Sequence, residues 1–206
     1  GLCMPDEYSA SDGEYGIRSL YFDDYSGTAY YENAMGINPR EKYRIRIYNC
    51  SADIIMLERK IKVNGRISKD RTRIDAGILQ AVISGQRDEM EYEQDNPLLN
   101  RFLQAYDTRY LRPKIIVDYV REAYVSTIDD VRITFDKHIS FSEDFESFFE
   151  PDLFLQPIMP LGKELMEVKY TDYLPEQIHR SLDLGRLRQN TFSKYYLCEH
   201  IRRGEY

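Results

Sequence analysis

Residues 42–49 read KYRIRIYN, and this stretch decides the fold. Successive side chains of a β-strand point to opposite faces of the sheet. As a strand, the segment therefore places Arg44 and Arg46 on one face and its large apolar residues on the other. We expect a sheet that carries charge on the side opposite its core.

Four further stretches show the same alternation of charged and apolar residues. They are IIMLERKIK (54–62), IIVDYVRE (115–122), VRITFD (131–136) and LMEVKY (165–170). The period of two pairs Glu58 with Lys60 and Lys62, Arg132 with Thr134 and Asp136, and Glu167 with Lys169. Five such segments predict one charged face that several strands build together.

The predicted charged face is strongly unbalanced. Its cations are Arg44, Arg46, Lys60, Lys62, Lys69, Arg121, Arg132, Lys169 and Lys194, and its acids are Glu58, Asp136 and Glu167. Nine cations against three acids leave an excess of six positive charges, although the whole chain carries a formal net charge of −7. The alternative is an ordinary solvated sheet face with paired charges, but surfaces selected for solubility normally mix the two signs.

A charged face of this kind is accommodated when the sheet curls around it. The opposite faces of the same strands carry bulky residues that need helices to cover them: Ile45, Ile47, Leu57, Ile61, Ile133, Phe135, Met166 and Val168. A sheet with helices outside and charges inside can form a barrel with a polar lumen. Like charges crowded there need water or a polyanion among them, so the pattern favours a cationic tunnel for a polyanion.

The order of predicted elements indicates the α+β class. After a loop over the first sixteen residues, we expect strands at 17–24, 42–49, 54–62, 66–74, 114–125, 130–136 and 164–170, and helices at 75–84, 97–110, 174–184 and 191–202. Turns are expected at 49–53, at Asn64-Gly65 and at 128–130, with a loop at 141–162. Gly85 should end the first helix, Asn96-Pro97 should start the second, and Gly185 should separate the last two.

Composition bounds the class of protein. A chain of 206 residues with 42% hydrophobic and 31% charged residues is typical of one globular domain, here spanning 1–206. No apolar run is long enough for a membrane span, and we expect no signal peptide. The three cysteines are scattered without metal-ligand spacing, so we expect reduced thiols and a cytoplasmic location. The net charge of −7 argues against nucleic acid as a partner, and we interpret the three histidines as structural.

Two acids within the basic face are candidate metal ligands. Carboxylates are hard oxygen donors that hold Mg²⁺ or Mn²⁺ together with phosphate oxygens. Glu167 is the better candidate, because Glu58 could equally serve to neutralise Lys60.

Six motifs resemble those of a known family in the same order. They are KYRIRIYN, LERKIKVNG followed by SKDR, RPKIIVDYVREAY, VRITFD, LMEVKY and TFSKYYLC. Together they resemble the polyphosphate polymerase domain of the vacuolar transporter chaperone (VTC) family, which belongs to the triphosphate tunnel metalloenzymes. The likeness runs from about Tyr15 to Leu197, and the opening IRSLYFDD is most similar to the bacterial branch.

The resemblance implies a fold, an activity and roles for single residues. It implies an antiparallel β-barrel that binds ATP, triphosphate or polyphosphate, with Mn²⁺ or Mg²⁺ near one wall, and that moves the γ-phosphoryl group of ATP onto a growing chain. The carried-over tunnel residues are Arg44, Arg46, Lys60, Arg121 and Lys194 as catalytic, Lys69 at a tunnel mouth, Glu167 for the metal, and Glu58 within the ERK element of its strand. Lys62, Arg132 and Lys169 share the same face and are predicted to bind substrate.

The chain departs from the family pattern at its start. The family begins with a strand that ends in Lys-Tyr and is followed by a helix, and GLCMPDEY (1–8) looks like the end of that helix. We therefore expect an N-terminally truncated domain whose barrel lacks a wall strand and exposes its edges.

Three functions fit the same scaffold at this point. They are a polyphosphate polymerase that uses a nucleoside triphosphate, a hydrolase of inorganic triphosphate, and a non-catalytic polyphosphate sensor. A metal ligand at Glu167 favours the two enzymes, and no water-activating base separates the polymerase from the hydrolase. The sequence leaves the oligomeric state open.

Overall fold

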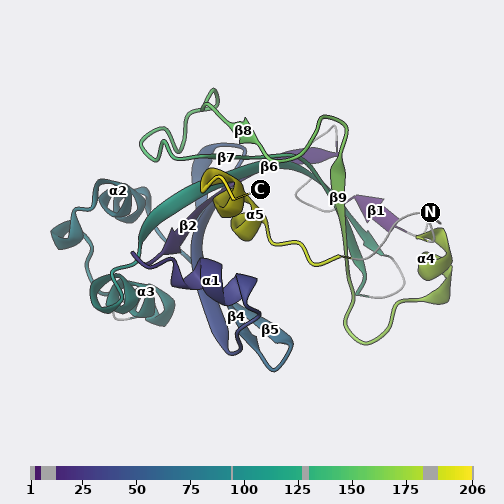
Figure 1. Cartoon of the computed structure of the whole chain (residues 1–206), viewed down its shortest axis with the longest axis horizontal. Coiled ribbons are helices and arrows are strands. Elements are labelled where there is room, and N and C mark those ends of the chain that lie inside the picture. Colours follow the sequence, from purple (N-terminus) through teal and green to yellow (C-terminus); the bar gives the residue numbers. More distant parts are fainter. Residues whose placement is uncertain (1–2, 6–12, 94, 127–129, 183–189, 206) are drawn as a thin grey trace.

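The structure, a computed structural model, describes residues 3–5, 13–93, 95–126, 130–182 and 190–205. One antiparallel sheet organises the described chain (Figure 1). Its strands are β1 (Cys3–Pro5), β2 (Glu14–Asp23), β3 (Arg40–Tyr48), β4 (Ser51–Val63), β5 (Arg66–Arg73), β6 (Arg112–Ser126), β7 (Arg132–Ser142), β8 (Gln156–Pro157) and β9 (Glu164–Lys169). The helices are α1 (Thr28–Ala34), α2 (Ala76–Ser84), α3 (Pro97–Thr108), α4 (Glu176–Ser181) and α5 (Lys194–Arg202), with a 3₁₀ turn at Arg87–Glu89.

The strands follow the order β5-β4-β3-β2-β6-β7-β8, with β1 beside β6 and β9 beside β7. This arrangement confirms the α+β class but not the barrel, since the sheet does not close. Among the described residues, β5 pairs only with β4, and β9 pairs only with β7. Alternation along a strand determines which face is polar, whereas closure depends on whether the two outermost strands meet. The outermost strand β5 is exposed along nearly its whole length and rich in basic residues, which discourages further strand pairing.

Two β-hairpins set the register of the central strands. Asn49 and Cys50 join β3 to β4 with φ of 51° and 55°, and Asn64 and Gly65 join β4 to β5 with φ of 50° and 78°. Two successive positive φ values are the signature of the type I′ turn, whose twist matches that of paired strands. The turns predicted at 49–53 and 64–65 are therefore confirmed, although the first needs only two residues.

Helices α2 and α3 begin at the residues that the capping pattern predicts, although α3 ends at Thr108 and α5 begins only at Lys194. The Asp75 side chain accepts a hydrogen bond from the Ile78 amide at the start of α2, and Gly85 ends that helix with φ of 70°. Asn96 accepts from the Leu99 amide at the start of α3, with Pro97 in the first turn. Such caps satisfy backbone groups that have no partner within the helix.

Several predicted bounds were wrong. The first sixteen residues are not all loop, because β1 and the start of β2 lie within them, and Cys3–Pro5 is a strand rather than the end of a helix. β7 continues to Ser142, and the loop expected at 141–162 contains β8. The helix at 174–184 is shorter, Glu176–Ser181. Residues 128–129 of one predicted turn, and Gly185, lie outside the described residues.

Buried side chains form separate clusters on the two faces of the sheet. We call the face that carries Arg44 and Arg46 the inner face and the opposite one the outer face. On the outer face, Ile45, Ile47 and Leu57 pack with residues of α2 and α3, and Ile133 packs with Ile178 of α4. The helices therefore cover the apolar side of the strands, as the alternation predicts.

The inner face has an apolar zone and a charged zone. In the apolar zone, residues of β2, β6 and β7 pack against α1 and α5, with Tyr195 and Cys198 fully buried. Figure 1 shows α5 (yellow) crossing the strands near α1. The charged zone lies beside it and contains the candidate site. Its members that the sequence predicts are Arg44, Arg46, Glu58, Lys60, Lys69, Arg121, Asp136, Glu167, Lys169 and Lys194.

Candidate functional site

Tyr119 on β6 is the point where three elements of the charged zone meet. Arg46 of β3 donates a hydrogen bond of 3.1 Å from Nη2 to the Tyr119 hydroxyl. The Arg121 guanidinium carbon lies 5.3 Å from the centre of the Tyr119 ring, and Lys194 Nζ lies 4.8 Å from it. Arg46 and Arg121 are only 6% and 7% exposed. Arg46, Arg121 and Lys194 thus converge on Tyr119 at the inner face.

Glu58 joins two strands of the charged zone. It accepts hydrogen bonds from Arg44 Nε at 2.6 Å and from Lys69 Nζ at 2.8 Å. Burial raises the pKa of the Glu58 carboxyl, but Arg44 and the neighbouring cations outweigh burial and lower this pKa to about 2. Glu58 is therefore ionised and holds the arginine of β3 and the lysine of β5 in place.

Asp136 plays the same part at the other end of the zone. Its two carboxylate oxygens accept bonds of 2.6 and 2.8 Å from Nε and Nη2 of Arg121, and Lys194 Nζ lies 2.6 Å away. The side chain is fully buried. Burial raises the pKa of this carboxyl, and the hydrogen bond from Arg121 together with Lys194 lowers it below its usual value. Asp136 therefore fixes a sheet residue and a helix residue against the Tyr119 ring.

Glu167 is the most accessible acid of the charged zone. Its side chain is 42% exposed, with Lys169 Nζ at 3.3 Å and Arg121 Nη2 at 3.9 Å. Burial raises the pKa of its carboxyl, but Lys169, Lys194 and Arg121 together lower it. Its cross-strand neighbour Thr134 is buried, and the Thr134 hydroxyl has no hydrogen-bond partner in the described chain. An ionised oxygen donor thus borders a polar group that no protein atom satisfies.

The remaining predicted residues lie around these three acids. Burial lowers the pKa of the Lys60 amine, and Glu167, on a strand far from it in the sheet order, partly opposes that effect. Arg132 donates a hydrogen bond of 3.1 Å to the Tyr15 hydroxyl. Lys62 lies beside Arg40 toward the end of β4, and within the described chain no ion pair links it to the other site residues.

Four residues of the zone were missed by the sequence reasoning. Tyr119 and Tyr21 place hydroxyls against Arg46 and Arg44, Ser19 accepts from Arg46 Nε at 3.1 Å, and Lys42 lies over the Tyr21 ring. Lys42 belongs to the same alternation as Arg44, so KYRIRIYN alone could have identified it. The tyrosines and Ser19 could be assigned only once the register of β2 and β6 was known.

The donor set limits how a divalent cation could bind. Within the described residues, no group of three or more His, Cys, Asp or Glu side chains is placed so that it could bind a metal ion. Glu58 has both oxygens in ion pairs, which leaves Glu167 as the accessible carboxylate. A single carboxylate fits Mg²⁺ or Mn²⁺ bound mainly through water and substrate phosphates. The inner face can accept such an ion together with a phosphate ligand.

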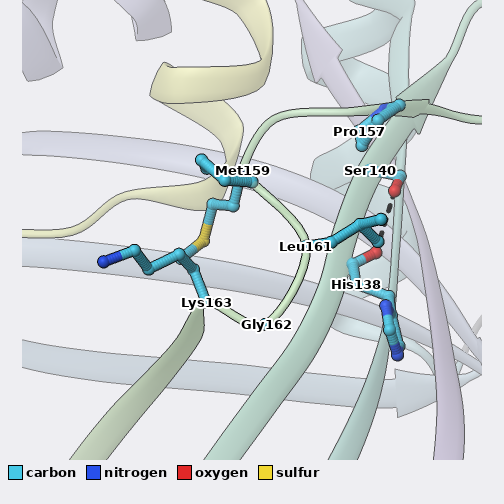
Figure 2. Close-up of a pocket in the computed structure, with 8 residues that line it drawn as sticks. His138, Ser140, Pro157, Met159, Leu161, Gly162 and Lys163 are labelled. Atoms are coloured by element: carbon cyan, nitrogen blue, oxygen red, sulfur yellow. Dashed lines mark hydrogen bonds between the residues drawn. The ribbon is translucent and has the colours of Figure 1, made fainter.

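A pocket elsewhere on the molecule is separate from this zone. Figure 2 shows it between His138 and Ser140 of β7, Pro157 of β8 and the following loop with Met159 and Leu161. The Ser140 hydroxyl donates a hydrogen bond of 2.8 Å to the His138 carbonyl. None of the charged-zone residues lines this pocket, and its only imidazole has no carboxylate beside it among the pocket's lining residues.

The described fold is similar to that of a solved structure, and a family model matches most of the sequence. A solved structure with a similar fold is a candidate adenylate cyclase from Bacillus halodurans, with a TM-score of 0.51 and 11% sequence identity over 88% of this chain and 82% of that one. At this identity the likeness bears on the fold alone. The VTC domain model matches residues 2–200, and the chain therefore belongs to the VTC domain family. The family resemblance seen in the six motifs is confirmed.

Two further observations complete the comparison. No curated protein matches the chain in sequence. In the described part of the chain, every helix is too short or too polar to cross a membrane.

Proposed function

We propose that this protein binds the phosphates of a triphosphate on its inner face and transfers a phosphoryl group from it, and that the product is polyphosphate made from a nucleoside triphosphate. Family membership and the tunnel-type fold support phosphoryl transfer on a triphosphate. The observation that carries the proposal is the convergence of Arg46, Arg121 and Lys194 on Tyr119, within a zone where cations outnumber acids.

Phosphoryl transfer requires mainly positioning and positive charge on the phosphate oxygens. In the proposed reaction, an oxygen of the acceptor chain forms a bond to the γ-phosphorus as the bond from that phosphorus to the β–γ bridging oxygen breaks. The leaving nucleoside diphosphate takes the bonding electrons. Arg44, Arg46 and Arg121 are suited to hold phosphate oxygens through paired N–H donors.

The lysines and the acids have complementary parts in this proposal. Lys60, Lys69, Lys169 and Lys194 act as point charges along the phosphate chain, together with Lys62 and Arg132 at its periphery. Asp136 and Glu58 position Arg121 and Arg44. We assign Glu167 to the divalent cation and do not retain Glu58 as a ligand, because two cations already neutralise Glu58. When bound, Mg²⁺ or Mn²⁺ would supply further positive charge to the phosphate oxygens.

Product analysis tests the proposal and separates its rivals. The purified chain is incubated with ATP and either Mn²⁺ or Mg²⁺, and the products are resolved on a polyacrylamide gel and assayed for free phosphate. The proposal predicts a ladder of long phosphate polymer with release of ADP. Free phosphate without polymer would replace it by a triphosphatase, and tight triphosphate binding without turnover would replace it by a polyphosphate sensor.

A matched variant makes the result specific to the site. Glu164 lies on β9 with Glu167, but its side chain is exposed and points to the other face of the strand. Glu167→Gln should abolish the metal-dependent activity. Glu164→Gln removes the same charge from the same strand but outside the site, so it should retain the full activity. Loss of activity in this control would indicate a general effect of charge on β9.

A further inference from the structure

A row of lysines crosses three neighbouring strands of the charged zone. Lys42 on β3 is the direct cross-strand partner of Lys60 on β4, which in turn is the partner of Lys69 on β5. Directly opposite residues in an antiparallel pair have Cβ atoms about 5 Å apart, and like charges there are destabilising. Glu58 binds Lys69 at 2.8 Å. In the described chain, however, no carboxylate lies within ion-pair distance of Lys42 or Lys60.

The surroundings of Lys42 do not neutralise its charge. Its Nζ lies 3.3 Å from the Ser193 hydroxyl and 5.8 Å from the centres of the Tyr21 and Tyr195 rings. These contacts come from Tyr21 of β2, from Tyr195 of α5 and from Ser193, the residue before α5, and none of them is a carboxylate. Burial raises the pKa of the Tyr21 hydroxyl, but Arg44 and Lys42 outweigh burial and lower this pKa to about 8. The cations that act most strongly on the Lys42 amine are Lys60 of β4 and the arginines Arg44 and Arg40 of β3 itself.

Charge repulsion also affects how Lys42 titrates. Burial lowers the pKa of the Lys42 amine to about 8, and Lys60, Arg44 and Arg40 act in the same direction. Tyr21 opposes this shift. Two adjacent amines in a partly buried site are thus held together although each makes the protonated form of the other less favourable.

We propose that Lys42 and Lys60 form a further phosphate subsite, which takes the extended part of a polyphosphate chain that reaches beyond the arginine cluster. The inference rests on the proposed function and names the feature that selects a long polyanion. Lys42 and Arg46 lie four residue steps apart along β3, a distance of roughly 13 Å at 3.3 Å per step. A ligand that contacts both ends must be extended, and a linear phosphate chain supplies one negative charge for every unit along that path.

The subsite predicts a dependence of affinity on chain length. Sodium triphosphate and size-fractionated long-chain polyphosphate are titrated into the wild-type chain and into Lys42→Met by isothermal calorimetry. Methionine keeps a similar length and volume without the charge. We expect the variant to lose at least about tenfold in affinity for long-chain polyphosphate, the effect of one charge-assisted contact. Its affinity for triphosphate should change by less than about twofold.

Independent readouts separate a failure of this inference from a failure of the proposed function. Lys163→Met serves as the matched control, since Lys163 is exposed on the loop before β9. Without ligand, Lys42→Met should melt at the same or a higher temperature than the wild type, because it removes one of two repelling charges. If the wild type binds triphosphate but Lys42→Met binds long chains as the wild type does, the subsite is refuted. If the wild type binds neither ligand, the proposed function itself fails.

Discussion

Asp136→Asn tests whether the charged zone is held together by its buried acids. The Asp136 side chain is fully buried and is shared by Arg121, through two hydrogen bonds of 2.6 and 2.8 Å, and by Lys194 at 2.6 Å. Asparagine has nearly the same shape, but it cannot neutralise either cation and presents an amide donor to one of them. The substitution therefore leaves two buried cations without their shared counter-charge.

The size of the effect follows from the burial. Removing one partner of a buried ion pair typically destabilises a protein by about 3–5 kcal/mol. In a chain of this length, 1 kcal/mol corresponds to roughly 2–4 °C in Tm, so the expected fall is roughly 6–20 °C. Asp88→Asn is the control: Asp88 is exposed in the turn after α2, and its substitution should change stability by no more than about 0.5 kcal/mol.

Ligand binding adds a readout that a merely structural aspartate would not move. Phosphate oxygens near Arg121 and Lys194 would supply the missing negative charge, so triphosphate should raise the Tm of Asp136→Asn more than that of the wild type. Thermal melts are followed by circular dichroism with and without triphosphate. A variant that melts as the wild type does, or one that gains no extra stabilisation from triphosphate, would contradict the assigned role of Asp136.

Three further predictions concern the metal, the arginines and pH. Glu167→Gln should abolish metal-dependent turnover while changing Tm little, since the side chain is 42% exposed; retained turnover in an assay with Mn²⁺ would remove Glu167 from the site. Arg44→Ala combined with Arg46→Ala should eliminate most of the rise in Tm that triphosphate causes, measured as a ligand-induced shift so that any loss of basal stability cancels. An unchanged shift would place the ligand elsewhere. Lys42, with its pKa lowered by burial to about 8 from an ordinary 10.5, destabilises the ligand-free fold while it is protonated. This penalty is full below pH 8 and is relieved as the pH rises toward 10.5, so chemical denaturation should show a rise in stability over this window that is smaller in Lys42→Met.

The faces of the strands could be predicted from the sequence because alternation is a local property. KYRIRIYN places Arg44 and Arg46 inside and Ile45 outside whatever the neighbouring strands are, and the structure has them so. The hairpin at Asn64-Gly65 and the caps at Asp75 and Asn96 are equally local, because each depends on a few adjacent residues.

Closure of the sheet and the exact partners in the site could not be predicted in this way. The open edge at β5 depends on how strands far apart in the sequence meet. The shift in register between β6 and β7 also depends on strands that are far apart in the sequence. His138, with φ of 54°, lies at this irregularity. Beyond it Ile139 and Phe141 face the apolar zone, although the charged residue Asp136 precedes them on the same face. A continuous period of two would have placed Ile139 and Phe141 on the outer face.

The acids of the charged zone explain how a cationic face can persist without a ligand. Glu58 bridges Arg44 and Lys69, and Asp136 bridges Arg121 and Lys194. Each acid carries one negative charge and contacts two cations, so it neutralises only one of the two positive charges at its end of the charged zone. Arg44 and Arg121, which the two acids hold in place, are also suited to two-point contact with phosphate.

The lysine row has no such acid, and this difference gives it a distinct role. An acid placed between Lys42 and Lys60 would stabilise the free protein, yet it would compete with any phosphate for the same amines. Leaving the two amines without a carboxylate therefore reduces the stability of the ligand-free chain and increases the gain when a polyanion binds. Functional sites commonly show this opposition between stability and binding. It follows that Lys42→Glu, which inserts the missing counter-charge, should raise the ligand-free Tm and abolish long-chain binding together; a variant that gained stability and still bound long chains would show that the polyanion does not use these amines.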